Sequence, residues 1–295
     1  MNGMTPKLLL VKGIKGVWHK AYPIILNSVL CKPAFLIEKC CGAIRSSLRG
    51  KPHISEEDVR NVEENVTFIY KSFNRQKQAK QLYHCVKSYY PNVKIIIADD
   101  SKEPLDLPDV IHLPFNSGLS KGLIAALEQV QTPYVMRMDD DELLTPASKI
   151  HEELKYLQEH AQVDLVGIQP MKNAKKSAAS YASVTMNKEL IIPAGTVIDG
   201  KTVVYKTPNV FLARTEKLRL VGYDPNIRMI DHHEFFYRAA GVLVCVQDEE
   251  ASILHLHYRF DKKYNPYRKD YGDDKIYIAV KHNYYRPPQN NAGDK

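Results

Sequence analysis

The stretch YVMRMDDDE, from Tyr134 to Glu142, is the most informative part of this 295-residue chain about its fold. A short apolar run leads directly into three consecutive aspartates, Asp139, Asp140 and Asp141. In open α/β sheets, ligands bind beyond the carboxyl ends of the strands. Carboxylate oxygens at such a place suit Mg²⁺ or Mn²⁺, and these ions usually bridge to substrate phosphates. The stretch therefore predicts a divalent metal site beside a nucleoside diphosphate, unless the aspartates only cap a helix expected after Pro146.

Strand-like and helix-like patterns alternate on both sides of this stretch. Strands are expected at residues 66–70, 93–98, 110–113, 134–138 and 164–169, and helices at 76–89, 119–130 and 146–160. Such alternation predicts an α/β fold with a doubly wound, mostly parallel, Rossmann-like sheet whose strand ends meet at one edge. The second strand runs into Asp99 and Asp100, so both acidic clusters are expected to face one crevice. The pattern loosens after Gln169 and resumes at 203–214.

The two ends of the chain differ from this central part. Residues 1–52 carry nine lysines and arginines against one glutamate, a charge of +8, which leaves −1 for the rest of the chain. No nucleic-acid partner is therefore expected. Basic and apolar residues over 1–54 are typical of helices on an anionic membrane surface, or of ordinary helices packed on the main domain. Ser55 opens a capping box, so the main domain is expected over 55–285, followed by a disordered tail over 286–295.

The cysteines indicate a reducing compartment. Their number is odd and no pair has metal-ligand spacing, which favours free thiols at Cys31, Cys40, Cys41, Cys85 and Cys245. No apolar stretch reaches the roughly 20 residues that span a bilayer, and no cleavable signal is evident. We therefore expect a cytoplasmic protein, held peripherally at the inner face of the cell membrane through residues 1–52.

Four motifs, taken in order, resemble those of family 2 glycosyltransferases with the GT-A fold. They are VTFIYKSFNR (66–75), IIIADDS (95–101), NSGLSKGLIAAL (116–127) and YVMRMDDDE (134–142). The stretch NVFLARTEKLRLVGYDPNIRMIDHHEFF (209–236) resembles, more narrowly, the ganglioside β-1,4-N-acetylgalactosaminyltransferases and their bacterial relatives. The resemblance covers about residues 62–260. It implies inverting transfer of a hexose or N-acetylhexosamine from a UDP-sugar to a hydroxyl of a glycan or glycolipid acceptor.

The resemblance also implies which residues bind the donor. The loop after the first strand would approach the nucleotide, Asp99 or Asp100 would accept hydrogen bonds from uracil or ribose, and a glycine-containing turn would lie against the donor. The implied donor-binding residues are Lys71, Ser72, Phe73, Arg75, Asp99, Asp100, Asn116, Gly118, Lys121, Asp139 and Asp140. The family often has arginine and asparagine in this turn, where the chain has Lys121 and Gly122.

The metal is expected to be Mn²⁺ or Mg²⁺, because Asp139 and Asp141 match the metal-binding aspartates of the family. Many such folds add a late histidine as a ligand, and ILHLHY offers His255 and His257, two residues apart on one face of a strand. His257 is the favoured ligand of the two. For either histidine, a buried structural role is the alternative interpretation.

An inverting transfer needs a base near the acceptor hydroxyl, and the segment DHHEFF offers candidates. Asp231 and Glu234 rank almost equally as the base, and His232 is a contact or an alternative base. The competing interpretation is that these acidic residues begin a helix, whose N-terminus favours negative charge.

Two other functions are compatible with parts of the sequence. A sugar-nucleotide nucleotidyltransferase would also use a doubly wound sheet and Mg²⁺, but the loop from Lys71 to Arg75 lacks the glycines of a phosphate loop. A non-catalytic membrane-surface adaptor is suggested by the basic segment 1–52. Within the transferase interpretation, the narrower resemblance favours N-acetylgalactosamine or a related donor sugar.

Overall fold

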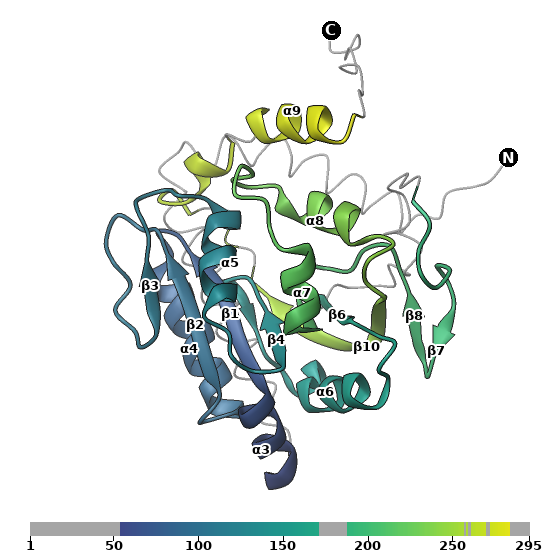
Figure 1. Cartoon of the computed structure of the whole chain (residues 1–295). Coiled ribbons are helices and arrows are strands. Elements are labelled where there is room, and N and C mark those ends of the chain that lie inside the picture. Colours follow the sequence, from purple (N-terminus) through teal and green to yellow (C-terminus); the bar gives the residue numbers. More distant parts are fainter. Residues whose placement is uncertain (1–53, 171–187, 257, 259–260, 270–271, 284–295) are drawn as a thin grey trace, which may run out of the picture.

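The computed structural model describes residues 54–170, 188–256, 258, 261–269 and 272–283. Its centre is a ten-stranded sheet with helices on both faces (Figure 1). The strand order is β3-β2-β1-β4-β9-β6-β10-β8-β7, and β5 pairs with β10 outside this path. The α/β architecture with a doubly wound sheet agrees with the prediction from sequence. The expected helices over 1–54 and the expected tail over 286–295 lie outside the described residues, apart from Ile54.

The strands divide into a parallel half and a mixed half. β1 pairs in parallel with β2 and β4, and β2 with β3. β9 then lies antiparallel between β4 and β6, and β10 runs parallel to β6. The strands are β1 (Val66–Ser72), β2 (Lys94–Asp99), β3 (Val110–His112), β4 (Tyr134–Arg137), β5 (Glu142–Leu143), β6 (Leu165–Pro170), β7 (Val197–Ile198), β8 (Lys201–Val203), β9 (Phe211–Arg214) and β10 (Cys245–His255).

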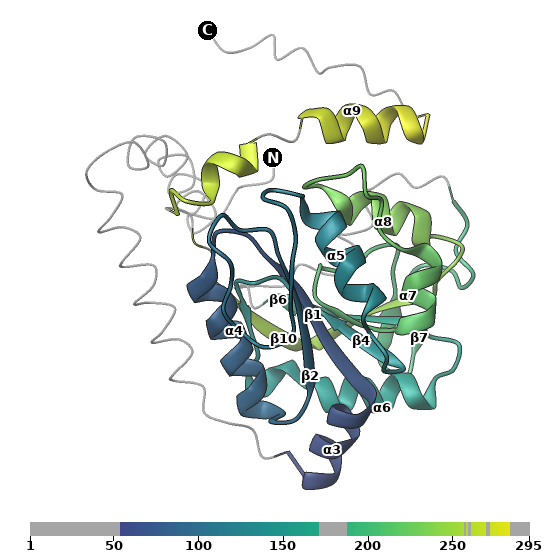
Figure 2. The same cartoon turned by 60° about the vertical axis from the view of Figure 1, so that its left-hand side comes forward.

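Two apolar cores cover the two faces of the sheet. One core joins it to α3 (Glu56–Asn65), α4 (Gln76–Tyr89) and α6 (Ile150–Glu159), and the other joins it to α5 (Leu119–Glu128), α7 (Thr215–Val221) and α8 (Asp231–Ala239). Strand β1 is buried along almost its whole length, as expected for a strand covered on both faces. The last helix, α9 (Gly272–Lys281), lies beyond α8 at one end of the molecule (Figure 2).

The parallel half brings the ends of three strands to one edge of the sheet. In the register, Ser72 at the end of β1 lies opposite Asp99 at the end of β2, and Ile69 lies opposite Arg137 at the end of β4. The chain segments that follow these strands therefore start close together. They contain the loop after β1, the Asp99–Asp100 pair and the three aspartates 139–141.

Several element boundaries differ from the prediction. The helix expected from Pro146 begins at Ile150, because Lys149 adopts a left-handed conformation (φ 50°) that separates α6 from the short 3-10 turn η1 (Pro146–Ser148). The pattern that resumes over 203–214 corresponds to the last residue of β8 and to β9. The helix after Ser55 is as predicted, since the Ser55 hydroxyl accepts a hydrogen bond from the Asp58 N–H (3.1 Å).

Across the described parts of the chain, no helix combines the length and the apolar character needed to cross a bilayer.

Gly167 in β6 allows a close packing contact that a larger side chain would break. A Cβ there would overlap the Thr207 side chain, with Thr207 Cγ2 2.6 Å away. Gly167→Ala is expected to lower the free energy of unfolding by about 1–3 kcal/mol through overpacking. Chemical denaturation measures the change. Gly272→Ala is the matched control because a Cβ at Gly272 meets no atom within 4 Å, and an equal loss in both variants would contradict the overpacking argument.

Candidate active site

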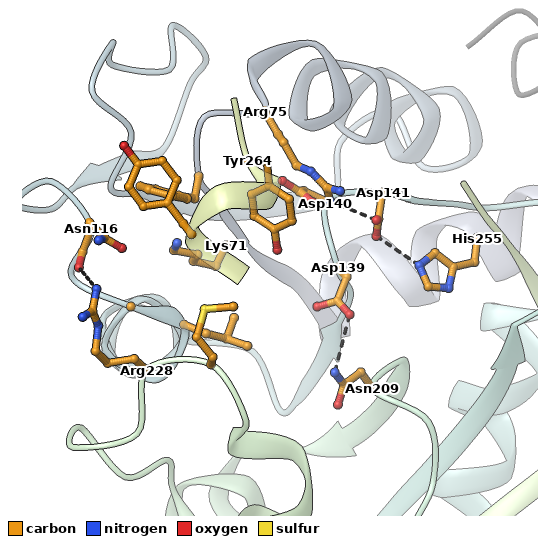
Figure 3. Close-up of a pocket in the computed structure, with 15 residues that line it drawn as sticks. Lys71, Arg75, Asn116, Asp139, Asp140, Asp141, Asn209, Arg228, His255 and Tyr264 are labelled. Carbon is orange, nitrogen blue, oxygen red and sulfur yellow. Dashed lines mark hydrogen bonds and ion pairs between the residues drawn. The ribbon is translucent and has the colours of Figure 1, made fainter. Parts of the chain in front are cut away.

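A cavity of about 230 Å³ opens at the sheet edge where β1 and β4 end (Figure 3). Seven of the eleven predicted donor-binding residues line it, together with Asp141, His255 and residues that were not predicted as site residues. The lining residues are Lys71, Phe73, Arg75, Asn116, Gly118, Leu119, Asp139, Asp140, Asp141, Asn209, Arg228, Met229, His255, Tyr264 and Tyr267. The three adjacent aspartates therefore border a cavity, as the metal site predicted at Asp139 and Asp141 requires.

Arg75 holds two of the aspartates together. Its Nη1 atom lies 2.9 Å from Asp140 Oδ1 and 2.9 Å from Asp141 Oδ2, and only 3% of its side chain is exposed. The guanidinium also stacks on the Tyr264 ring, with 3.8 Å from Cζ to the ring centroid. A buried guanidinium between two carboxylates offsets their mutual repulsion. Arg75 therefore supports the acidic cluster as well as lining the cavity.

The two aspartates differ in how readily they ionise. Burial raises the pKa of Asp140, and the Arg75 charge only partly opposes this effect. Burial also disfavours the charged form of Asp141, but the hydrogen bond from His255 and the charge of Arg75 outweigh it and lower the pKa of Asp141. His255 Nε2 lies 3.3 Å from Asp141 Oδ1. Asp141 is therefore an ionised carboxylate over the neutral pH range.

Asp139 is the most exposed of the three aspartates. Its side chain is 32% exposed, against 9% for Asp140 and for Asp141. Arg137, buried in β4, lies 2.9 Å from Asp139 Oδ1 through Nη2 and donates from Nη1 to the Asn209 carbonyl (2.6 Å). Asn209 Nδ2 in turn lies 3.5 Å from Asp139 Oδ2. These contacts orient a carboxylate that remains open to the cavity.

The donor atoms in this cavity fit a hard divalent cation. Asp139 and Asp141 offer oxygens and His255 offers an imidazole, and such ions often take only one or two carboxylates and complete their shell with water and phosphate. Within the described ranges, no three His, Cys, Asp or Glu side chains form a ready metal cluster. His257, the histidine favoured from sequence, lies outside the described residues, so its role stays a prediction.

The four remaining predicted donor-binding residues do not line the cavity. Asp100 is fully buried and holds two lining groups, Lys71 Nζ at 2.6 Å and the Gly118 N–H at 3.0 Å. Asp99 accepts from the Ser101 hydroxyl (2.6 Å) and the Leu105 N–H (2.8 Å). The acidic pair after β2 therefore faces the polypeptide, in contrast to the expectation that both acidic clusters face one crevice. Ser72 is fully buried, and Lys121 is exposed.

Asp231 and His232 begin α8, close to the acidic cluster but outside the lining of the cavity. Burial raises the pKa of Asp231 to about 6, with the Arg137 charge opposing and the Asp139 charge adding to the effect. His232 Nε2 lies 2.7 Å from the Thr207 carbonyl, and burial holds its pKa well below the ordinary value. His232 is therefore a neutral imidazole that can donate to this backbone oxygen.

Glu234, the other base candidate, belongs to a cluster of ion pairs away from the cavity. Its Oε1 atom lies 2.7 Å from Arg238 Nε, 2.7 Å from Lys281 Nζ and 3.1 Å from His282 Nε2. Burial disfavours its charged form, but the hydrogen bonds from Arg238 and Lys281 lower its pKa. The cluster joins α8 to the end of α9, so these contacts give Glu234 a structural role.

Sequence reasoning missed several residues that line or support the cavity. Arg137, which contacts Asp139 from within β4, could have been noticed because it is a lone cation inside the apolar run YVMRM. Asn209 and Arg228 stand in segments quoted only for their resemblance. Tyr264 and Tyr267 follow β10 in the sequence and line the cavity only through the tertiary fold. Figure 3 shows Tyr264 beside Arg75.

Gly118 allows the turn before α5 to approach the loop at Arg228. Its φ is +101°, and a Cβ would lie 3.1 Å from Arg228 Cα. Gly118→Ala is expected to destabilise the fold by about 1–3 kcal/mol, as measured by chemical denaturation. Gly195→Ala is the control, because Gly195 has a similar φ of +88° but open space around it. Equal effects would show that backbone strain alone, not the contact with Arg228, is responsible.

Comparison with known proteins agrees with this geometry. Residues 67–240 match the family model "Glycosyl transferase family 2". The chain is 35% identical over 198 residues to mouse β-1,4 N-acetylgalactosaminyltransferase 2, an alignment that covers 64% of this chain but only 38% of that protein. The chain thus spans well under half the length of the curated relatives it matches.

Two solved structures share the fold. The mannosyltransferase PcManGT from Pyrobaculum calidifontis, in complex with GDP-Man and Mn²⁺, superposes with a TM-score of 0.53 at 12% identity, over 88% of this chain and 75% of that one. S. aureus TarS 1–349, in complex with UDP-GlcNAc, gives a TM-score of 0.50 at 15% identity, over 73% of this chain and 66% of that one. The fold and the family predicted from the motifs are both confirmed: the chain belongs to glycosyltransferase family 2.

Proposed function

We propose that this protein is a metal-dependent, inverting glycosyltransferase that transfers a hexose or N-acetylhexosamine from a UDP-sugar to a hydroxyl of a glycan or glycolipid. One observation carries the proposal: Asp139 and Asp141, at the end of β4, line the same cavity as the basic residues Lys71 and Arg228. Carboxylates that can hold a cation beside basic side chains suit a nucleoside diphosphate. A membrane-surface adaptor would not need this arrangement, and a nucleotidyltransferase would need the missing phosphate loop.

The donor sugar is proposed from the relatives. Proteins 35% and 33% identical to this chain are named β-1,4 N-acetylgalactosaminyltransferases, and TarS was solved with UDP-GlcNAc. We therefore favour an N-acetylhexosamine donor, with N-acetylgalactosamine first. Binding to an anionic membrane surface through residues 1–52, on the cytoplasmic side, is part of the proposal and is supported by the charge of that segment.

Asp139, Asp141 and His255 would hold the Mn²⁺ or Mg²⁺ ion, which supplies Lewis-acid stabilisation of the leaving diphosphate when it is bound. Arg75 contacts Asp140 and Asp141, and Arg137 contacts Asp139. These contacts keep the carboxylates in place. Arg228 adds positive charge to the wall of the cavity, where it would stabilise the charge that develops on the phosphate oxygen. Lys71 lies in the same wall as an ion pair with Asp100.

Asp231 is the proposed base. Its carboxylate would accept the proton of the acceptor hydroxyl while that oxygen bonds to the anomeric carbon and the bond to the diphosphate breaks. A single displacement of this kind inverts the configuration. The raised pKa of Asp231 suits a base near neutral pH, whereas Glu234 is already engaged by three basic side chains.

UDP release from a panel of UDP-sugars tests the function and its metal dependence together. Release is expected with Mn²⁺ and is expected to stop with EDTA. Asp141→Asn is expected to lower the rate by about 100-fold or more, because a charged ligand is lost. Asp106→Asn is the control, since Asp106 is exposed on a loop. Full activity in EDTA, or in a folded Asp141→Asn variant, would remove the metal from the proposal.

The pH dependence distinguishes the two base candidates. Asp231 is surrounded by Arg137, Asp139, Lys206 and Tyr223, and burial raises its pKa to about 6. The ionised form accepts the proton and is lost as the pH falls, so kcat/KM is expected to drop below about pH 6 if Asp231 is the base.

The pKa of Glu234 is lowered, so a Glu234 base would keep the enzyme active below the ordinary pKa of a glutamate. The measurement is kcat/KM against pH, with circular dichroism at each pH to confirm that the protein stays folded. If kcat/KM falls only at a pH well below 6, the base is Glu234 and not Asp231.

A further inference from the structure

Asp274, in the first turn of α9, makes an unusual set of hydrogen bonds for a helix residue. Only 4% of it is exposed, and its carboxylate accepts from three consecutive backbone N–H groups. Arg228 N lies 3.0 Å from Oδ1 and 3.2 Å from Oδ2, Met229 N lies 2.7 Å from Oδ2, and Ile230 N lies 3.2 Å from Oδ2. Successive N–H groups that converge on one anion form a rigid turn.

This turn connects the donor cavity to the candidate base. Arg228 and Met229 line the cavity, and Ile230 is the residue before α8, which begins at the candidate base Asp231. The turn is also fastened to the glycine-containing turn before α5. The Arg228 carbonyl accepts from the Leu119 N–H (2.7 Å), and Arg228 Nη2 donates to the Asn116 carbonyl (3.2 Å). A displacement of 228–230 would therefore move the cavity wall and the base together.

The start of α8 depends on this outside support. Its N-cap residue, Ile230, has no side chain that could accept from the first N–H groups of the helix. Asp274 instead holds the three N–H groups that precede the helix. The helix that carries Asp274 is anchored at its other end, where Lys281 Nζ lies 2.6 Å from Asp224 and 2.7 Å from Glu234. Because α9 is fixed at both ends, the Asp274 carboxylate can hold the 228–230 turn in a defined position.

We propose that Asp274 is a positioning residue of the transferase: it fixes the 228–230 turn, and through it the Arg228 side of the donor cavity and the base Asp231. This inference rests on the proposed function. It assigns the C-terminal helix α9 a part in the reaction even though none of the α9 residues lines the described cavity.

The test compares Asp274→Ala and Asp274→Asn with Asp273→Asn in the full chain. Asp273 is adjacent, exposed and equally charged, so it controls for charge and for changes in α9. Hydrogen exchange followed by mass spectrometry reports the 228–230 amides, and UDP release with Mn²⁺ reports kcat and KM. In Asp274→Ala, exchange at 228–230 is expected to rise about tenfold or more. kcat/KM is expected to fall about 10- to 100-fold, because small displacements of reacting groups are costly.

Asp274→Asn keeps one oxygen acceptor, so a smaller effect of the same sign is expected, and this variant serves if Asp274→Ala does not fold. Asp273→Asn is expected to match the wild type in both measurements. A purely structural role would lower the melting temperature but leave kcat/KM of the folded variant unchanged, and that result would overturn the inference.

The two proposals can fail separately. Absence of UDP release by the wild type with every UDP-sugar would contradict the proposed function. The exchange rates would then decide whether Asp274 holds the turn. Unchanged exchange at 228–230 in the variants would overturn the inference, whereas faster exchange confined to residues 228–231 would support it.

Discussion

Three adjacent aspartates can remain at the end of a buried strand because positive or hydrogen-bonding groups from several elements meet them there. Arg75 comes from the loop between β1 and α4, Arg137 from β4 itself and His255 from the end of β10. Removing one partner of a buried ion pair typically costs about 3–5 kcal/mol, since the remaining charge is left uncompensated. The strand order of the sheet is thus coupled to the acidic cluster: only when β1, β4 and β10 are in place are the three groups within reach.

The same contacts give the three aspartates different properties. Asp140 is turned toward Arg75 and largely buried, Asp141 is kept ionised by His255 and Arg75, and Asp139 is oriented by Arg137 and Asn209 while it stays open to the cavity. Three identical side chains in a row therefore have three environments. This division of roles supports Asp139 and Asp141 as the ligands of a cation and gives Asp140 a supporting position.

The other side of the site depends on the C-terminal part of the chain. Tyr264 stacks on Arg75, Asp274 holds the turn before α8, and Lys281 contacts Glu234 inside α8. Each contact joins residues that are far apart in the sequence, and the first two reach segments that line the cavity. The C-terminal residues therefore contribute to the site mainly by holding other parts of it in position, and two tyrosines line it directly.

The sequence alone determined the fold class, the family and the acidic edge of the cavity, because these depend on local patterns: alternating strands and helices, and carboxylates directly after an apolar run. Only the tertiary structure decided which charges are paired. Asp99 ends β2 and Asp139 comes just after β4, yet the first turns into the chain and the second toward the cavity. Asp231 and Glu234 are three residues apart, but only Glu234 meets Lys281 and His282. The physical reason is that pairing and burial of a carboxylate depend on distant partners, which no local pattern encodes.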